Sequence, residues 1–117
     1  MKNYNDLLDL LGFGKHNALK IPEIQKLSAD QSEPAKFRSR VVLLAKEARQ
    51  NGNKLISDES GYYKAINEAE WENYKEKRLS LFTEELQTFA HIERISVSDL
   101  IKNIYHTNVR ENNYELF

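Results

Sequence analysis

The sequence contains no cysteine, which excludes disulfide bonds, thiolate metal sites and cysteine nucleophiles. Long apolar runs are lacking too: no stretch approaches the roughly 20 residues that span a bilayer, and the polar residues 1–6 are not followed by the apolar region of a signal peptide. Proteins of a reducing cytosol rarely use disulfides. We therefore expect a soluble, cytoplasmic protein that has no role at a membrane.

Catalytic and cofactor motifs are lacking as well. His16, His91 and His106 lie far apart in the sequence, and none is followed by a second histidine four residues later, so the usual spacing of a zinc site is missing. No glycine-rich phosphate loop or nucleophile elbow is present. The sequence thus predicts a non-enzyme with no catalytic residues, no metal and no cofactor.

What the chain does have is the composition of a packed, mainly helical domain. Of its 117 residues, 40% are hydrophobic and 10% aromatic, whereas only four are glycine and two are proline. This length fits a single core, since domains usually hold roughly 100 to 200 residues.

The first part of the chain alternates short helices with turn signals. Four leucines within residues 4–11 predict a helix that Gly12 and Gly14 terminate. Residues 18–21 alternate in polarity and predict a short strand, and Pro22 suits the first turn of a helix over residues 21–27. The polar, turn-forming residues 28–34 separate this helix from the next one, which Pro34 can open.

A longer helix and a hairpin follow. Over residues 34–50, Phe37, Val41, Leu44 and Ala48 recur at spacings of four, three and four, which places them on one helical face. Residues 55–57 and 62–64 flank a polar turn that ends in Gly61, and this pattern predicts a β-hairpin.

Two further helices are predicted from their capping residues. Asn67 precedes Glu70 by three residues and opens a long helix that runs to about residue 92, and Ser96 precedes Asp99 in the same way. We predict a mainly α fold with a small β-hairpin. It consists of a winged helix-turn-helix domain over residues 1–66, a helical extension over 67–105 that packs on it or mediates dimerisation, and a polar tail over 106–117.

Basic residues are concentrated in the middle third of the chain. The whole chain has a net charge of -1, yet the segment 20–54 holds eight basic and four acidic residues, so it carries about +4 and the remainder about -5. Lysine and arginine on the outer face of a helix suit DNA phosphates and guanine edges. We expect the helix over 34–50 to read the major groove of double-stranded DNA, with these contact residues: Lys36, Arg38, Ser39, Arg40, Leu43, Lys46 and Lys54.

A resemblance to known proteins rests on three parts of the chain: the segment from Asn17 to Ile24, the basic helix after it and the run from Leu55 to Tyr63. They resemble the winged-helix domains of replication or regulatory proteins from phages and mobile elements of low-GC bacteria. The resemblance covers about residues 14–75 and implies that Lys36 to Arg40 make the first-turn DNA contacts. Two departures are a longer linker over residues 29–34 and the acidic pair Asp58 and Glu59 at the tip of the wing.

Two alternatives stay open at this point. The protein is either a DNA-binding factor in replication or transcription control, or an inhibitor or adaptor that uses a winged scaffold to bind a host replication or defence protein. A long helix after the wing also suggests a homodimer, and a monomer is the alternative. A homodimer would bind palindromic half-sites on the DNA.

The C-terminal half carries weaker signals. The last five residues resemble the peptide that binds the bacterial sliding clamp and predict Tyr114, Leu116 and Phe117 as protein-binding residues, but docking of this tail on its own domain is the reading we favour. Residues 78–82 match the same peptide pattern, but we favour a role for them in the helix core or in an interface. We expect packing, and no ligand pocket, from the apolar and aromatic residues at helical spacing: Trp71, Tyr74, Leu81, Phe82, Leu86 and Phe89.

Overall fold

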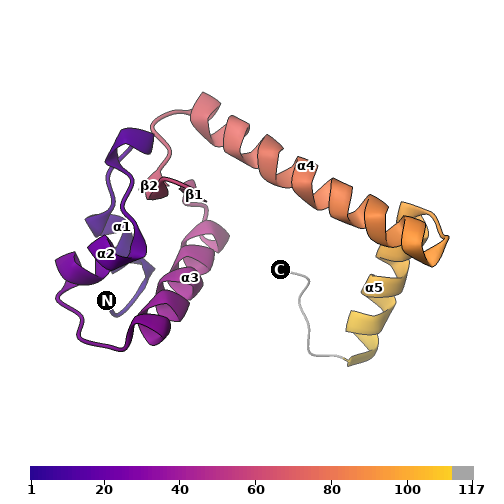
Figure 1. Ribbon diagram of the computed structural model, residues 1–117, viewed down its shortest axis with the longest axis horizontal. Helices are drawn as coiled ribbons and strands as arrows, with labels where there is room; N and C mark the ends of the chain where they lie inside the picture. Colours follow the sequence, from indigo (N-terminus) through magenta and orange to yellow (C-terminus); the bar gives the residue numbers. More distant parts are fainter. Residues whose placement is uncertain (112–117) are drawn as a thin grey trace. The chain divides into compact units, whose positions relative to one another are not determined.

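The computed structural model describes residues 1–111, with side chains for residues 1–105. The chain divides into an N-terminal unit, residues 1–74, and a C-terminal unit that begins at residue 75. Helices dominate, and the strands of the described part form one two-stranded antiparallel hairpin (Figure 1). The predicted fold class, mainly α with a small hairpin, is therefore confirmed at this coarse level.

Three helices and a short 3-10 turn build most of the N-terminal unit. They are α1 (Tyr4–Leu10), η1 (Lys15–Asn17), α2 (Ile21–Ser28) and α3 (Pro34–Gln50). A capping box opens α1, because Asp6 N donates to Asn3 Oδ1 and Asn3 N donates to Asp6 Oδ2, both over 3.2 Å. Both prolines lie in the first turn of their helices, where no intrahelical hydrogen bond is lost.

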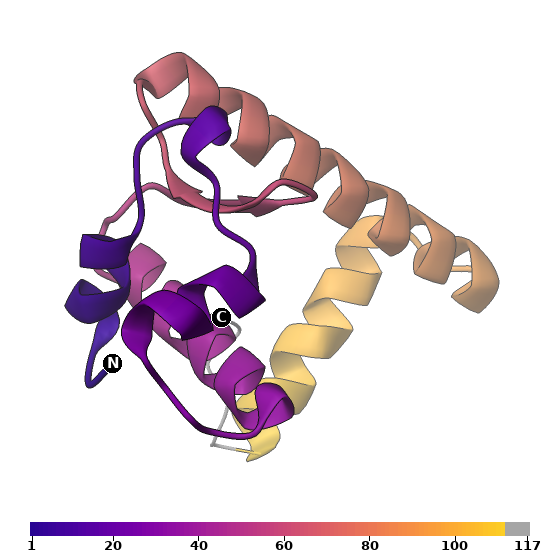
Figure 2. The same cartoon turned by 60° about the vertical axis from the view of Figure 1, so that its left-hand side comes forward.

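The core of the N-terminal unit lies where α3 packs against α1 and α2 (Figure 2). The predicted inner face of α3 is buried: the exposed fractions of Phe37, Val41, Leu44 and Ala48 are 3% or less. Burying a large apolar side chain contributes roughly 1.5–3 kcal/mol, so this face fixes the orientation of α3. The opposite face of the same helix is thereby turned to solvent.

The hairpin consists of β1 (Leu55–Asp58) and β2 (Gly61–Lys64), with Leu55 opposite Lys64. Leu19 forms an antiparallel bridge with Tyr62 on the outer edge of β2, through hydrogen bonds of 2.8 and 3.0 Å. The strand predicted for residues 18–21 is thus reduced to one bridged residue. It nevertheless adds a third chain segment to the hairpin and covers an edge that would otherwise be free to pair.

The remaining helices are α4 (Glu68–Glu93) and α5 (Val97–Glu111). Their predicted caps are present: Glu70 N donates to Asn67 Oδ1, and Asp99 N donates to Ser96 Oγ. Between the helices, Arg94 adopts a left-handed φ of 56°, and Ile95 N donates to the Ala90 carbonyl, which completes a Schellman motif. Helix α5 continues to residue 111, beyond the end predicted at 105.

No helix within residues 1–111 combines the length and the apolarity that a membrane span requires. The same described residues contain no group of three or more histidine, aspartate or glutamate side chains placed to hold a metal ion.

Candidate nucleic-acid interface

The outer face of α3 is the most basic helical surface of the N-terminal unit. Lys36, Ser39, Leu43 and Lys46 are all exposed and recur at the spacing of one helical face. Ser39 Oγ donates to the Ala35 carbonyl over 3.1 Å, so this hydroxyl lies along the helix. The structure therefore brings together four of the residues predicted to contact DNA.

Charge on this helix has one sign over most of its length. From Pro34 to Lys46 the sequence holds four basic residues and no acidic one, and the first acid is the half-buried Glu47. No described side chain caps the first turn of α3, where the positive end of the helix dipole lies. Uncapped backbone amides and nearby lysines are the features with which helix N-termini bind phosphate.

Arg40, another predicted contact residue, has a structural partner. Its guanidinium donates to the Met1 carbonyl over 2.6 and 2.9 Å and to the Lys2 carbonyl over 3.3 Å. These bonds tie the N-terminus of the chain to the edge of α3. Arg40 stays exposed, but its replacement would release the N-terminal segment as well as remove a charge.

Arg38 lies apart from the outer face, in a groove beside the hairpin. This groove has a volume of about 590 Å³, and Lys20, Ser57 and Tyr62 are among the residues that line it with Arg38. The groove runs between the first turn of α2, α3 and the hairpin turn. Arg38 is thus placed to contact a partner that touches α3 and the hairpin together.

Lys54, the last predicted contact residue, forms an ion pair with Glu68 at the start of α4. Nearby, Arg49 Nε donates to the Leu55 carbonyl over 2.8 Å, and its guanidinium lies 6.0 Å from the ring centre of Tyr74. Arg49 was counted in the basic segment but not predicted as a contact residue, and here it joins α3, β1 and α4. Both cations hold together the end of α3, the hairpin and the first turns of α4.

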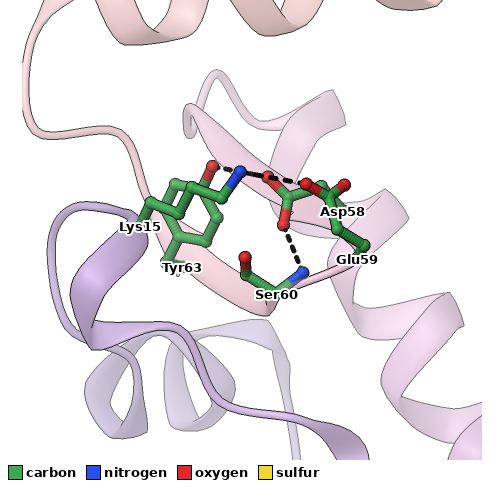
Figure 3. Close-up of polar contacts among 5 residues, drawn as sticks. All are labelled: Lys15, Asp58, Glu59, Ser60 and Tyr63. Carbon is green, nitrogen blue, oxygen red and sulfur yellow. Dashed lines mark hydrogen bonds and ion pairs between the residues drawn. The ribbon is translucent and has the colours of Figure 1, made fainter.

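The acids at the hairpin tip have local partners (Figure 3). Asp58 accepts hydrogen bonds from Tyr63 Oη over 2.7 Å and from Ser60 N over 2.8 Å, and Glu59 forms an ion pair with Lys15 over 3.0 Å. Burial, together with the hydrogen bond to Asp58, raises the pKa of Tyr63 well above its ordinary value, so Tyr63 remains a donor. The Glu59 contact likewise raises the pKa of Lys15.

Asp58 and Glu59, the acidic pair noted in the sequence as a departure from the winged-helix pattern, each have a structural role. One carboxylate stabilises the turn, and the charge of the other is offset by Lys15. The pattern Asp58-x-Ser60 is typical of an Asx turn and could have revealed the first contact. Nothing in the sequence indicated the second, because Lys15 and Glu59 are 44 residues apart.

The three predicted protein-binding residues, Tyr114, Leu116 and Phe117, lie outside the described residues. Comparison with known proteins gave no match: no protein-family model fits the chain, and no curated protein or solved structure resembles it at a significant level.

Proposed function

We propose that residues 1–74 form a winged helix-turn-helix domain that binds double-stranded DNA, with the outer face of α3 in the major groove. The observation that carries this proposal is the run from Pro34 to Lys46, which has four exposed basic residues and no acid. A major groove about 12 Å wide admits an α-helix, and lysine or arginine on it contacts phosphates and guanine edges.

The order of elements supports the same function. A helix, a bridged residue at Leu19, two helices and a hairpin follow one another in the order of a winged domain. The linker between α2 and α3 is ordered by Gln25, whose amide donates to the Asp30 and Ser32 carbonyls over 3.3 and 2.8 Å. The extra linker length noted in the sequence is therefore compatible with a fixed angle between the two helices.

Control of replication or transcription in a phage or mobile element is the biological setting that the sequence resemblance implies. In that setting the hairpin is the wing beside the DNA, and Arg38 and Lys20 in the adjoining groove contact the phosphate backbone. The domain then acts without a catalytic step, by occupying its site.

Salt-dependent binding to a fluorescent duplex of about 20 base pairs, two helical turns, tests this function. We expect a dissociation constant of roughly 10⁻⁶–10⁻⁴ M for a duplex of arbitrary sequence. The double variant Lys36→Ala/Lys46→Ala should lower the slope of log affinity against log salt by about two, because two phosphate contacts are lost.

The matched control is Lys77→Ala/Lys102→Ala, which removes the same charge from exposed residues of the C-terminal unit. It should leave the slope unchanged. Equal slopes for all three proteins, or no binding by the wild type, would overturn the DNA-binding proposal and leave the adaptor function as the alternative to pursue.

A further inference from the structure

Two large apolar side chains lie exposed on the basic outer face of α3. The exposed fraction is 51% for Val42 and 52% for Leu43, whereas their sequence neighbours Val41 and Leu44 are buried in the core. Leu43 was predicted as a DNA contact and Val42 was not. We call Val42 and Leu43 the apolar pair. The charges that support DNA binding give this pair no role.

The apolar pair lies at the middle of the outer face. Ser39 and Lys46 are seven residues apart, so they define a line along α3, and this line runs nearly opposite the buried face. At 100° per residue, Val42 and Leu43 lie about 50° to either side of the line and about one turn from each end of it. A helix that turns its outer face to the floor of a groove therefore points both side chains of the pair at that floor.

Cations border the apolar pair on both sides. Measured from the same line, Lys36 lies about 70° away on the side of Leu43, and Arg38 about 90° away on the side of Val42. The two phosphate backbones of a duplex border the major groove, and the base edges lie between them. The order cation, apolar pair, cation across α3 thus matches the order backbone, bases, backbone across the groove.

Thymine is the base whose major-groove edge fits the apolar pair. It presents a 5-methyl group there beside its O4 acceptor, whereas the other base edges present hydrogen-bond donors and acceptors, and apolar side chains contact this methyl group in direct readout. Against the amino group of cytosine, the same side chains would leave a donor without a partner, which costs binding free energy.

We infer that Val42 and Leu43 select DNA sites by contacting the 5-methyl groups of thymine on the floor of the major groove. This inference rests on the proposed DNA binding and adds to it the base that α3 selects. The basic residues at the edges of the helix then position it on any duplex through the phosphates, and the apolar pair provides the preference among sequences.

The surroundings of the apolar pair favour DNA over a protein as its partner. The core of a protein interface is depleted of charged residues, whereas this pair lies among the four basic residues of the run from Pro34 to Lys46. Two half-exposed side chains are also a small part of the roughly 800 Å² that each partner buries in a standard protein interface. A polyanion with single methyl groups between its charges fits this face better.

The experiment begins with selection of bound duplexes of about 20 base pairs from a random pool by the full chain. Each thymine of the selected site is then replaced by deoxyuridine, which pairs in the same way and lacks the 5-methyl group. We expect thymine at one fixed position of the site or more. Replacement there should weaken binding by roughly fourfold, the effect of removing one buried methyl group.

Alanine variants test whether the apolar pair makes these contacts. Val42→Ala/Leu43→Ala replaces two exposed residues by a stronger helix former, so α3 should stay folded. This double variant should bind the thymine and uracil duplexes equally and keep the wild-type slope of log affinity against log salt, because an apolar contact releases no counterions. The matched control is Leu79→Ala in α4, which removes an equally exposed leucine and should retain the fourfold preference.

The outcomes separate this inference from the proposed function. Absence of binding to any duplex overturns both. Salt-dependent binding without a thymine-containing site, or with no effect of uracil at any position, overturns the inference and leaves DNA binding in place. An effect of uracil that persists in the double variant also overturns the inference, because other side chains then contact the methyl group.

Discussion

The two units of the chain use their apolar residues in opposite ways. Of the twelve buried hydrophobic residues in the described structure, eleven lie in residues 1–74, and Ala90 is the one beyond. The N-terminal unit therefore has its own core. In the described part of the C-terminal unit, most large apolar side chains are exposed, with exposed fractions of 41–66%. The N-terminal unit thus encloses many of its apolar residues, whereas the described part of the C-terminal unit encloses few.

The same contrast holds for the two helices that present surfaces. The outer face of α3 is basic and carries two exposed large apolar residues, Val42 and Leu43. A basic face suits a hydrated, negatively charged partner such as DNA. Helix α4 carries charges of both signs and exposes Leu81, Phe82 and Phe89, which were expected to pack but have exposed fractions of 55–60% in the described chain. The exposed surfaces of these two helices therefore differ in charge and in polarity.

The largest expected effect separates a buried phenylalanine from an exposed one. Phe37→Ala should destabilise the N-terminal unit by roughly 3–5 kcal/mol, because it leaves a cavity in the core, whereas Phe82→Ala should change the stability of this unit by less than about 0.5 kcal/mol. Urea unfolding followed by the fluorescence of Trp71, the only tryptophan, measures both. Equal losses would mean that the two units share one core.

A smaller effect distinguishes two glycines of the N-terminal unit. A Cβ at Gly61 would overlap the Leu19 carbonyl oxygen and lie 2.6 Å from its carbon, whereas a Cβ at Gly52 meets nothing within 4 Å. Both glycines have positive φ, 121° and 86°, so both alanine variants carry backbone strain of roughly 1–2 kcal/mol.

Gly61→Ala should therefore unfold at a lower urea concentration than Gly52→Ala, because it also breaks the Leu19–Tyr62 bridge. Amide hydrogen exchange at Leu19 and Tyr62 should rise only in Gly61→Ala. If the two variants have the same midpoint and the same exchange, the bridged segment contributes nothing to the stability of the unit.

The smallest effect concerns pH. Hydrogen bonds from the backbone N–H groups of Lys2 and Asn3 lower the pKa of Asp6 below its ordinary value of 3.8. A carboxyl group whose pKa is lower in the folded state stabilises the fold at any pH above its pKa in the unfolded state. This stabilisation is lost as the pH falls through the pKa of the folded state. Asp6→Asn should therefore lose less stability than the wild type between about pH 5 and about pH 2.

Asp9→Asn, on the same helix, is the matched control and should follow the wild type. Urea midpoints over this pH range measure both variants. A wild-type profile that coincides with that of Asp6→Asn would show that the capping box of α1 contributes no pH-dependent stability.

Local signals predicted most of the secondary structure. Pro34, the inner stripe from Phe37 to Ala48 and the Asn-Gly pair after residue 50 predicted α3 with its observed bounds. The caps at Asn67 and Ser96 predicted where α4 and α5 begin. These signals act within a few residues, so a single sequence contains them in full.

Contacts between distant residues were not predictable in the same way. The Leu19–Tyr62 bridge and the bonds from Arg40 to Met1 and Lys2 join segments about 40 residues apart, and no local pattern specifies them. The apolar spacing of α4 predicted a packing face but not what packs on it. Periodicity identifies a face that favours burial, whereas the partner is determined by the rest of the structure.

Backbone amide chemical shifts of the 117-residue chain, recorded during titration with duplex DNA, test the division between the two units most directly. The account predicts that the shifts change over the exposed part of α3, residues 34–46, and around the hairpin, residues 57–62, and stay constant over residues 78–92 of α4. Changes confined to residues 78–92, or no change at any residue at saturating DNA, would contradict it.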